Sequence, residues 1–340
     1  MTDINIRIEG RAGRITLTRP KALNAVTYDM CTAIETALDQ WRADDTVALV
    51  VIDAEGDKAF SAGGDIADLY ATGKAGDFAY GRTFWRDEYR MNAKIHEYAK
   101  PIVSFLQGFT MGGGMGVGCH GSHRIVGETS QIAMPEVGIG LVPDVGGSMI
   151  LANAPGHLGT YAGVTGARMG AADAILVGFA DMFISQEKWP GLIERLTTSG
   201  DTACLVAGDA PEGSFAALQP AIDAHFAAPT LPGLLANLRR DPGEFAQKTL
   251  KTVLRNSPLS VAVTIQMMAR LRGVTDIRAA LDLEYRYTYR AMEHGDFIEG
   301  IRAAIIDKDR SPQWKHDPDT LPQEAIDTML APLGDQALTF

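Results

Sequence analysis

The sequence has few cysteines and no long apolar segment, and each scarcity excludes a class of protein. Its 340 residues include only three cysteines, Cys31, Cys119 and Cys204. They are far apart and odd in number, so they predict neither a disulfide framework nor a zinc site. No apolar run reaches the roughly 20 residues of a membrane-spanning helix. Because the start, MTDINIRIEG, resembles neither a signal nor a transit peptide, we expect a cytoplasmic protein without a membrane partner.

Positive charge is also scarce. Lysine and arginine number 31 against 42 acidic residues, which gives a net charge of −11. Nucleic-acid binding requires a basic face, so we expect no nucleic-acid partner, although a local basic patch for a phosphorylated small molecule is compatible with this composition. The 46% hydrophobic content is that of an ordinary globular protein, and the length allows one large domain or two.

Several familiar catalytic motifs are missing or out of place. The phosphate loop fails because Ala75 follows Gly73-Lys74. The dinucleotide fingerprint is met literally from Gly116, but the strand-like residues 124–126 follow where a long helix should begin. No Gly-x-Ser-x-Gly elbow occurs. The adjacent side chains of Cys119 and His120 diverge on either a helix or a strand, which argues against a catalytic pair.

The order of apolar segments predicts an α/β fold. Alternating isoleucines over residues 4–17 indicate a β-hairpin, and the continuous apolar runs at 47–52 and 102–106 are typical of strands buried on both faces. Thr27 is suited to cap a helix whose apolar residues recur every three or four positions. A longer helix is expected over residues 78–98. Strands and helices therefore alternate, as in βαβ units.

The second half of the sequence is predicted to be mainly helical. Residues 245–255, 259–272 and 276–292 have helical periodicity, and Ser257 with Pro258 marks the start of the second helix. The chain thus divides into an α/β core at residues 1–200, a Gly- and Pro-rich linker or insertion at 201–242, and a helical region at 243–340.

Two glycine-rich turns, each after a predicted buried strand, give the strongest functional signal. One is Ser61-Ala62-Gly63-Gly64-Asp65 and the other is Gly112-Gly113-Gly114. Glycine leaves backbone N–H groups exposed, and the first donors of a helix lack intrahelical acceptors. We expect each turn to give one N–H to a single carbonyl oxygen that gains negative charge. The alternative is structural: glycines also permit tight packing of a strand against a helix.

Two carboxylates lie among apolar residues downstream. Glu136 follows Met134-Pro135 at the end of a short strand, and Asp144 precedes Gly146-Gly147. Apolar surroundings disfavour the charged form of a carboxyl group, which raises its pKa towards values useful for acid–base chemistry. Either residue has a structural alternative as a helix cap, and Asp144 is well placed to be the N-cap of the next helix.

Three segments resemble the crotonase (enoyl-CoA hydratase/isomerase) superfamily. They are AFSAGGD at residues 59–65, GFTMGGG at 108–114 and PEVGIGLVPD at 135–144. The resemblance covers about residues 10–185. Arg86-Asp87-Glu88-Tyr89 and the segment 296–309 are typical of a branch that hydrolyses short branched 3-hydroxyacyl-CoA thioesters, and they extend the resemblance nearly to the end of the chain.

The resemblance implies a crotonase-like spiral of ββα units that binds an acyl-CoA. Coenzyme A is then part of the substrate, and neither a cofactor nor a metal is expected. By position, the oxyanion-hole donors are the N–H groups of Ala62 and Gly113, and the catalytic carboxylates are Glu136 and Asp144. The implied substrate-binding residues are Lys21, Ala22, Leu23, Gly63, Gly64, Asp65, Glu88 and Gly112. Hydratase relatives form trimers, so a homo-oligomer is one option, and long C-terminal helices folded back on their own subunit are the other.

One departure separates this chain from the hydratases that it resembles. They add water with two glutamates, and the first of these falls at Gly116 while the second is Glu136. A single carboxylate with an oxyanion hole suffices for hydrolysis of 3-hydroxyisobutyryl-CoA to 3-hydroxyisobutyrate and CoA, as in valine breakdown. Glu136 would be the nucleophile or the general base, and Asp144 would contact the 3-hydroxyl or the water. The alternatives are a hydratase or isomerase, with Asp144 or Glu88 replacing the missing glutamate, and a non-catalytic acyl-CoA-binding protein.

Overall fold

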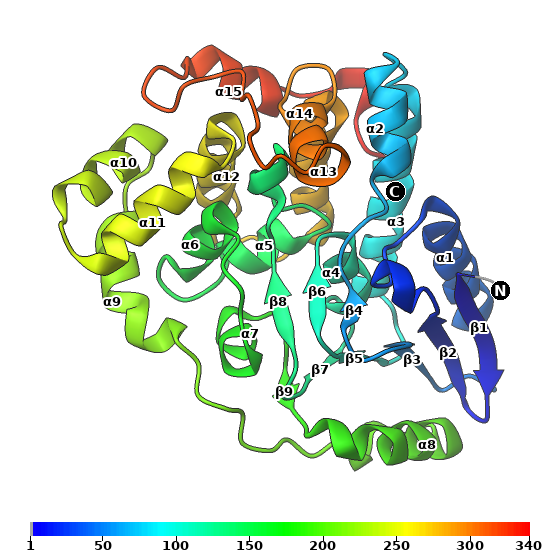
Figure 1. Cartoon of the computed structure of the whole chain (residues 1–340). Helices are drawn as coiled ribbons and strands as arrows, with labels where there is room; N and C mark the ends of the chain where they lie inside the picture. The colour runs from blue at the N-terminus through cyan, green and yellow to red at the C-terminus, as the bar shows by residue number, and fades with distance from the viewer. Residues whose placement is uncertain (1–2) are drawn as a thin grey trace. The chain divides into compact units, whose positions relative to one another are not determined.

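The computed structural model describes residues 3–340 (Figure 1). These residues form two compact units. The first unit holds the residues up to Asp65 together with Asp87–Ala133 and Arg168–Ser214, and the second unit holds Ile66–Arg86, Met134–Ala167 and Phe215–Phe340. The chain therefore passes between the units several times, unlike the consecutive division expected from composition.

The first unit contains two sheets. The larger sheet runs in the order β1 (Ile4–Glu9), β2 (Ala12–Leu17), β3 (Leu49–Ala54), β5 (Ile102–Leu106), β7 (His123–Val126) and β9 (Met182–Phe183). Only β1 and β2 are antiparallel, and they form the predicted hairpin with Ile6 opposite Ile15. The smaller, parallel sheet contains β4 (Ala59–Ser61), β6 (Phe109–Met111) and β8 (Gln131–Ala133).

Successive strands alternate between these sheets. β3, β5 and β7 lie in the larger sheet, and each is followed by its partner β4, β6 or β8 in the smaller sheet. Helices follow the strand pairs, with α2 (Ala67–Lys74) and α3 (Ala79–His96) after β4 and α4 (Gly113–Gly118) after β6. This repeat confirms the predicted spiral of ββα units. It also places both glycine-rich turns directly after strands of the smaller sheet.

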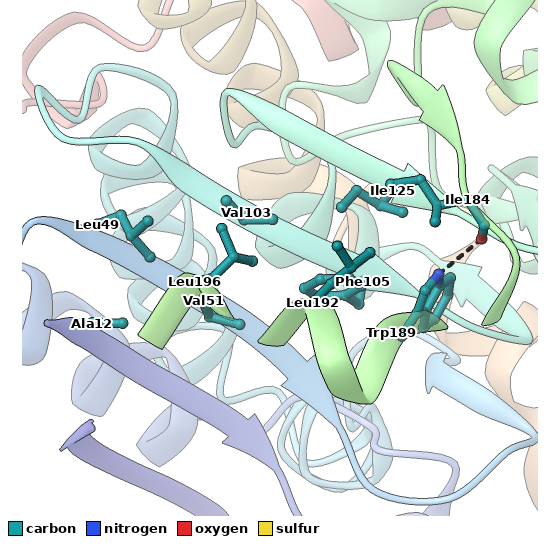
Figure 2. Close-up of a cluster of buried hydrophobic side chains, with 10 residues drawn as sticks. All are labelled: Ala12, Leu49, Val51, Val103, Phe105, Ile125, Ile184, Trp189, Leu192 and Leu196. Atoms are coloured by element: carbon teal, nitrogen blue, oxygen red, sulfur yellow. Dashed lines mark hydrogen bonds between the residues drawn. The ribbon is translucent and has the colours of Figure 1, made fainter. Parts of the chain in front are cut away.

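The helices of the first unit cover the larger sheet with apolar side chains. α1 (Tyr28–Arg42) begins as predicted, because Thr27 Oγ1 accepts the N–H of Met30 at 3.2 Å. On α8 (Trp189–Ser199), Trp189, Leu192 and Leu196 pack on residues of β2, β3, β5 and β7 (Figure 2). The indole N–H of Trp189 donates to the carbonyl of Ile184 at 2.8 Å, so its one polar group is satisfied. This cluster holds α8 against the larger sheet. The short α7 (Ala171–Val177) precedes β9.

The second unit is helical, as the sequence predicts. Beyond α2 and the start of α3 it contains α5 (Gly147–Ala152), α6 (Leu158–Thr165), α9 (Phe215–Phe226), α10 (Leu231–Arg240), α11 (Glu244–Arg255), α12 (Pro258–Leu271), α13 (Ile277–Ala291), α14 (Phe297–Ile301) and α15 (Gln323–Leu330). Ser257 caps α12, with Pro258 at its first position, and Asp276 caps α13. Within residues 3–340, no helix is both long enough and apolar enough to cross a bilayer.

The segment 201–242, expected to be a linker or insertion, contains α9 and α10. The composition did not indicate these helices, because alanine and glycine are compatible with short helices when tertiary packing supplies the stability. Tyr161 of α6 provides that packing, with ring centroids 5.5 Å from Phe215, 5.4 Å from Phe226 and 5.7 Å from Phe245. The domain boundaries at 200 and 242 themselves stay a prediction.

Candidate active site

The two glycine-rich turns meet in the first unit. A Cβ atom added to Gly113 would lie 3.2 Å from the nitrogen of Gly64 and 2.8 Å from Oε1 of Glu88. Gly113 is the first residue of α4, so its N–H has no intrahelical acceptor. Within residues 3–340, the Gly64 N–H has no hydrogen-bond acceptor either. Two available backbone donors from separate turns therefore lie close together, beside a buried carboxyl group.

Ala62 does not supply one of these donors. Its N–H donates to the carbonyl of Leu23 at 2.9 Å. Two further bonds, from Val26 N to Gly63 O at 2.9 Å and from Asp65 N to Val26 O at 2.8 Å, tie the same turn to the segment before α1. This corrects the expectation that Ala62 contributes to an oxyanion hole. Ala62 holds the turn in place, and Gly64 presents the available N–H.

Backbone conformation or packing explains why glycine occupies several other positions of the two turns. Gly63 has φ +119° and Gly112 has φ +47°, conformations that disfavour any residue with a Cβ. A Cβ on Gly114 would lie 2.6 Å from Cβ of Ser61, so glycine there allows α4 to pack on β4. The packing explanation therefore accounts for Gly114. A Cβ on Gly64 would meet no atom within 4 Å, so neither crowding nor positive φ requires glycine there.

The segment expected to bind coenzyme A lines a cavity of about 310 Å³ in the first unit. Lys21 and Leu23 contribute to its wall, which also carries one further lysine, Lys58, and two carboxylates. Ala22 is not part of this wall, although it lies in the same turn, η1 (Pro20–Ala22). Asp65 forms an ion pair with Arg19 at 3.0 Å, so its carboxylate has a structural role.

Glu136 begins a 3-10 turn, η2 (Glu136–Ile139), in the second unit. Its side chain is buried, with 5% of the residue exposed, and among residues 3–340 its Oε2 atom has no hydrogen-bond partner. The pKa of Glu136 is raised well above its ordinary value, first by burial and then by the negative charges of Asp144 and Glu284. The apolar environment predicted from the sequence is therefore present.

Asp144 lies in the turn before α5 and is also buried. The N-cap residue of α5 is Gly146, two positions further along the chain, so Asp144 is not the N-cap residue of this helix. The backbone of this turn is unusual, because Val145 has φ +50° and Gly146 has φ +80°. A β-branched residue in the left-handed region is a genuine outlier.

A third carboxyl group, Glu284 of α13, was missed by the sequence analysis. It is fully buried. Its Oε2 accepts the N–H of Gly146 at 2.9 Å, and its Oε1 accepts the N–H of Ser148 at 3.3 Å and the Ser148 hydroxyl. Burial, followed by the charge of Asp144, raises the pKa of Glu284 to about 8. The signal that was available is its position on the apolar stripe of α13, three residues after Leu281.

The surroundings of Cys119 and His120 do not indicate a catalytic pair. Cys119 is buried, and burial raises its pKa to about 12, so it is not a thiolate nucleophile at neutral pH. The ring of His120 packs against that of His96, 5.7 Å away between centroids. In the part of the chain that the structure describes, no group of three or more His, Cys, Asp or Glu side chains is arranged to hold a metal ion.

Comparison with known proteins gives consistent results. The family model for enoyl-CoA hydratase/isomerase matches residues 12–330. A mitochondrial 3-hydroxyisobutyryl-CoA hydrolase from Danio rerio is 37% identical over 345 residues, which cover 97% of this chain and 89% of the relative. A crystal structure of an enoyl-CoA hydratase from Rhodobacter sphaeroides 2.4.1 is 57% identical, with a TM-score of 0.97 over 100% of both chains.

A second crystal structure, of a carnitinyl-CoA dehydratase from Mycobacterium thermoresistibile, is 37% identical, has a TM-score of 0.95, and covers 100% of this chain and 99% of that one. The similarity thus extends over the spiral and the C-terminal helices alike. The names differ in the reaction, but all refer to CoA thioesters. The chain belongs to the enoyl-CoA hydratase/isomerase family, with its crotonase-like fold, and is an enzyme of that family.

Proposed function

We propose that the chain hydrolyses the thioester of a short branched 3-hydroxyacyl-CoA, with 3-hydroxyisobutyryl-CoA as the first substrate to test. The observation that carries this proposal is the environment of Glu136, a buried carboxyl group with an unpartnered oxygen and a raised pKa. The position of the first hydratase glutamate is Gly116, inside α4, which has no acidic residue. A relative with this hydrolase name, 37% identical, supports the same reaction.

In the proposed reaction, the N–H groups of Gly64 and Gly113 bind the thioester carbonyl oxygen. They stabilise the negative charge that develops when the carbonyl carbon is attacked. Loss of one such donor raises the activation free energy by about 2.7–4 kcal/mol in a comparable oxyanion hole. Both donors are backbone groups held by the fold, so they need no reorganisation during the reaction.

Glu136 supplies the nucleophile by one of two routes. As a general base it takes a proton from water, the water oxygen bonds to the carbonyl carbon, and the C–S bond breaks to release CoA as a thiol after protonation. As a nucleophile it bonds to the carbonyl carbon itself, releases CoA, and is freed when water cleaves the resulting anhydride. A raised pKa makes the ionised Glu136 a stronger base in either route. CoA is part of the substrate, and neither route requires a further cofactor.

Asp144 has a supporting role in the proposal. After burial, its negative charge is the largest cause of the raised pKa of Glu136. We assign Asp144 to the substrate 3-hydroxyl or to the attacking water.

The direct test is release of free thiol from 3-hydroxyisobutyryl-CoA, followed with a thiol-trapping reagent. The proposal predicts stoichiometric CoA release by the purified protein. It is contradicted if the protein binds the thioester but releases no thiol.

Hydration of an enoyl-CoA is the second candidate, because the 57% identical structure is named an enoyl-CoA hydratase. Glu88 favours it chemically, since its Oε1 lies 2.8 Å from where a Gly113 Cβ would stand and offers a second carboxyl group beside the donors. Crotonyl-CoA separates the candidates. A hydratase removes its enoyl absorbance without thiol release, whereas the proposed hydrolase produces thiol from the 3-hydroxyacyl thioester.

A further inference from the structure

The turn that carries Asp144 is held in a disfavoured conformation. Val145 and Gly146 are both left-handed, at φ +50° and +80°, and Val145 is 1% exposed. Strained backbone of this kind persists only where the surroundings determine it, and it is common at functional sites. The turn leads into α5, which has only six residues and whose N-cap residue, Gly146, has no side chain to cap the helix.

Glu284 of α13 holds this turn through hydrogen bonds. Its two oxygens accept three hydrogen bonds, from the N–H groups of Gly146 and Ser148 and from the Ser148 hydroxyl. Ser148 and Glu284 are both fully buried, so no water competes for these donors. The carboxyl group therefore takes the place of the capping side chain that the N-cap residue Gly146 lacks, although it lies 138 positions away from Gly146 in the sequence.

We propose that Glu284 is a positioning residue, which fixes the turn of Asp144 and sets the charge of the carboxyl cluster formed by Glu136, Asp144 and Glu284. This inference rests on the proposed hydrolase function, because it concerns how the same carboxyl groups are made ready for that reaction. Glu284 itself touches neither water nor substrate in this account.

The charges around Glu284 are mostly negative. Asp144 acts on it from the turn before α5, and Glu136 of η2 is in turn affected by Glu284. α5 contributes no titratable side chain, and α15, which also packs on α13, brings only Glu324 and Asp327, both exposed. A third buried negative charge would therefore be repelled, which favours a protonated Glu284.

The arginines that follow Glu284 on α13 are engaged elsewhere. Arg286 pairs with Asp282 at 2.7 Å, and Arg290 donates to the carbonyl of Ala331 at 2.7 Å. At neutral pH Glu284 then keeps its proton and adds no negative charge to the cluster. Above about pH 8 Glu284 ionises, and its added charge raises the pKa of Glu136 further. Glu284 thus limits how easily Glu136 loses its proton.

The test compares Glu284→Gln with the intact protein in two measurements. The first is the free energy of unfolding in denaturant between pH 5 and pH 9, without substrate. Because the pKa of Glu284 is raised on folding, the folded protein retains a proton that the unfolded chain loses, so stability falls as pH rises from the ordinary glutamate range to about 8. Glu284→Gln is expected to remove this contribution to the slope.

The second measurement is the pH dependence of kcat/KM for thioester hydrolysis. With glutamine at 284 no charge forms there, so we expect the rising limb assigned to Glu136 to move to lower pH, by about half a unit or more. The matched control is Asp282→Asn, which removes a partly exposed carboxylate from the same helix and should leave the position of the limb unchanged.

Ser148→Ala provides a second variant if glutamine at 284 prevents folding. The Ser148 hydroxyl bond lowers the pKa of Glu284, so its removal should extend the unfolding slope to higher pH. The proposal is overturned if neither variant changes the pH dependence of the free energy of unfolding. It is also overturned if this dependence changes in a variant that is still active but whose rising limb of kcat/KM stays at the same pH. An intact protein that shows the slope but releases no thiol contradicts the hydrolase function alone.

Discussion

In the reaction that we propose, the two glycine turns of the first unit and the carboxyl cluster of the second act in different ways. At the turns, the proposed donors are the backbone N–H groups of Gly64 and Gly113, and both residues are glycines without a side chain. In the cluster, the working groups are side chains whose properties come from burial and mutual repulsion. The backbone N–H donors therefore do not change their charge with pH, whereas the carboxyl groups do.

The largest expected effect on kcat comes from a substitution in the carboxyl cluster. Glu136→Gln keeps the shape of the side chain but removes its basicity. We expect kcat for thioester hydrolysis to fall by about a thousandfold, within the range of general acid–base catalysis, while binding of the CoA thioester changes little. Initial rates of thiol release and calorimetric titration with substrate measure the two quantities. A variant that retains more than a tenth of the activity would remove Glu136 from the reaction.

The backbone half is tested by Gly113→Ala. The new Cβ would lie 2.8 Å from Oε1 of Glu88 and 3.2 Å from the nitrogen of Gly64, so it crowds both the donor pair and the carboxyl group. We expect a loss of about a hundredfold in kcat, comparable to removal of one oxyanion-hole donor.

The matched control for this change is Gly191→Ala on α8, where an added Cβ meets no atom within 4 Å. It should leave kcat unchanged. Equal losses in both variants would show that the effect arises from general destabilisation, and full activity of Gly113→Ala would remove that residue from the oxyanion hole.

The pH dependence distinguishes the two halves. Because the pKa of Glu136 is raised, its ionised form appears only as pH rises well above the ordinary glutamate range. We expect kcat/KM to increase about tenfold per pH unit along that limb and then to level off. In Gly113→Ala the limb should keep its position while its plateau falls. A profile already flat from pH 5 upwards would contradict the raised pKa.

The smallest expected effect is on ground-state binding at the cavity of the first unit. Lys21 and Lys58 both line it, and lysine binds phosphate as a point charge. Replacing either lysine by alanine should raise KM severalfold with kcat unchanged, the pattern of lost uniform binding. Replacing Asp57 of the same wall by asparagine should lower KM slightly. A fall in kcat in the lysine variants would place this cavity nearer to the chemistry than we propose.

The sequence predicted much of this structure because the relevant signals are local. The hairpin at residues 4–17, the cap at Thr27 and the start of α12 at Ser257-Pro258 each follow from neighbouring residues. The apolar surroundings of Glu136 were also readable, because its near neighbours in sequence include Met134 and Val137, which are buried with it.

The errors came from contacts that sequence proximity does not reveal. Ala62 and Gly64 are two residues apart and look equivalent as donors, but the bond from Ala62 N to Leu23 O decides between them. Glu284 lies 138 positions from the glycine whose N–H it accepts, and in sequence it is one more charged residue on a helix. The helices within the segment 201–242 were not foreseen, because they depend on aromatic packing against Tyr161.

The central claim is that this enzyme breaks the C–S bond of a thioester with water that Glu136 prepares. Incubation of 3-hydroxyisobutyryl-CoA with the enzyme in ¹⁸O-labelled water, followed by mass spectrometry, tests it most directly. Our account predicts free CoA and an acid with ¹⁸O in its carboxylate, both lost in Glu136→Gln. Intact thioester with ¹⁸O in its 3-hydroxyl group would show reversible hydration instead and would contradict the account.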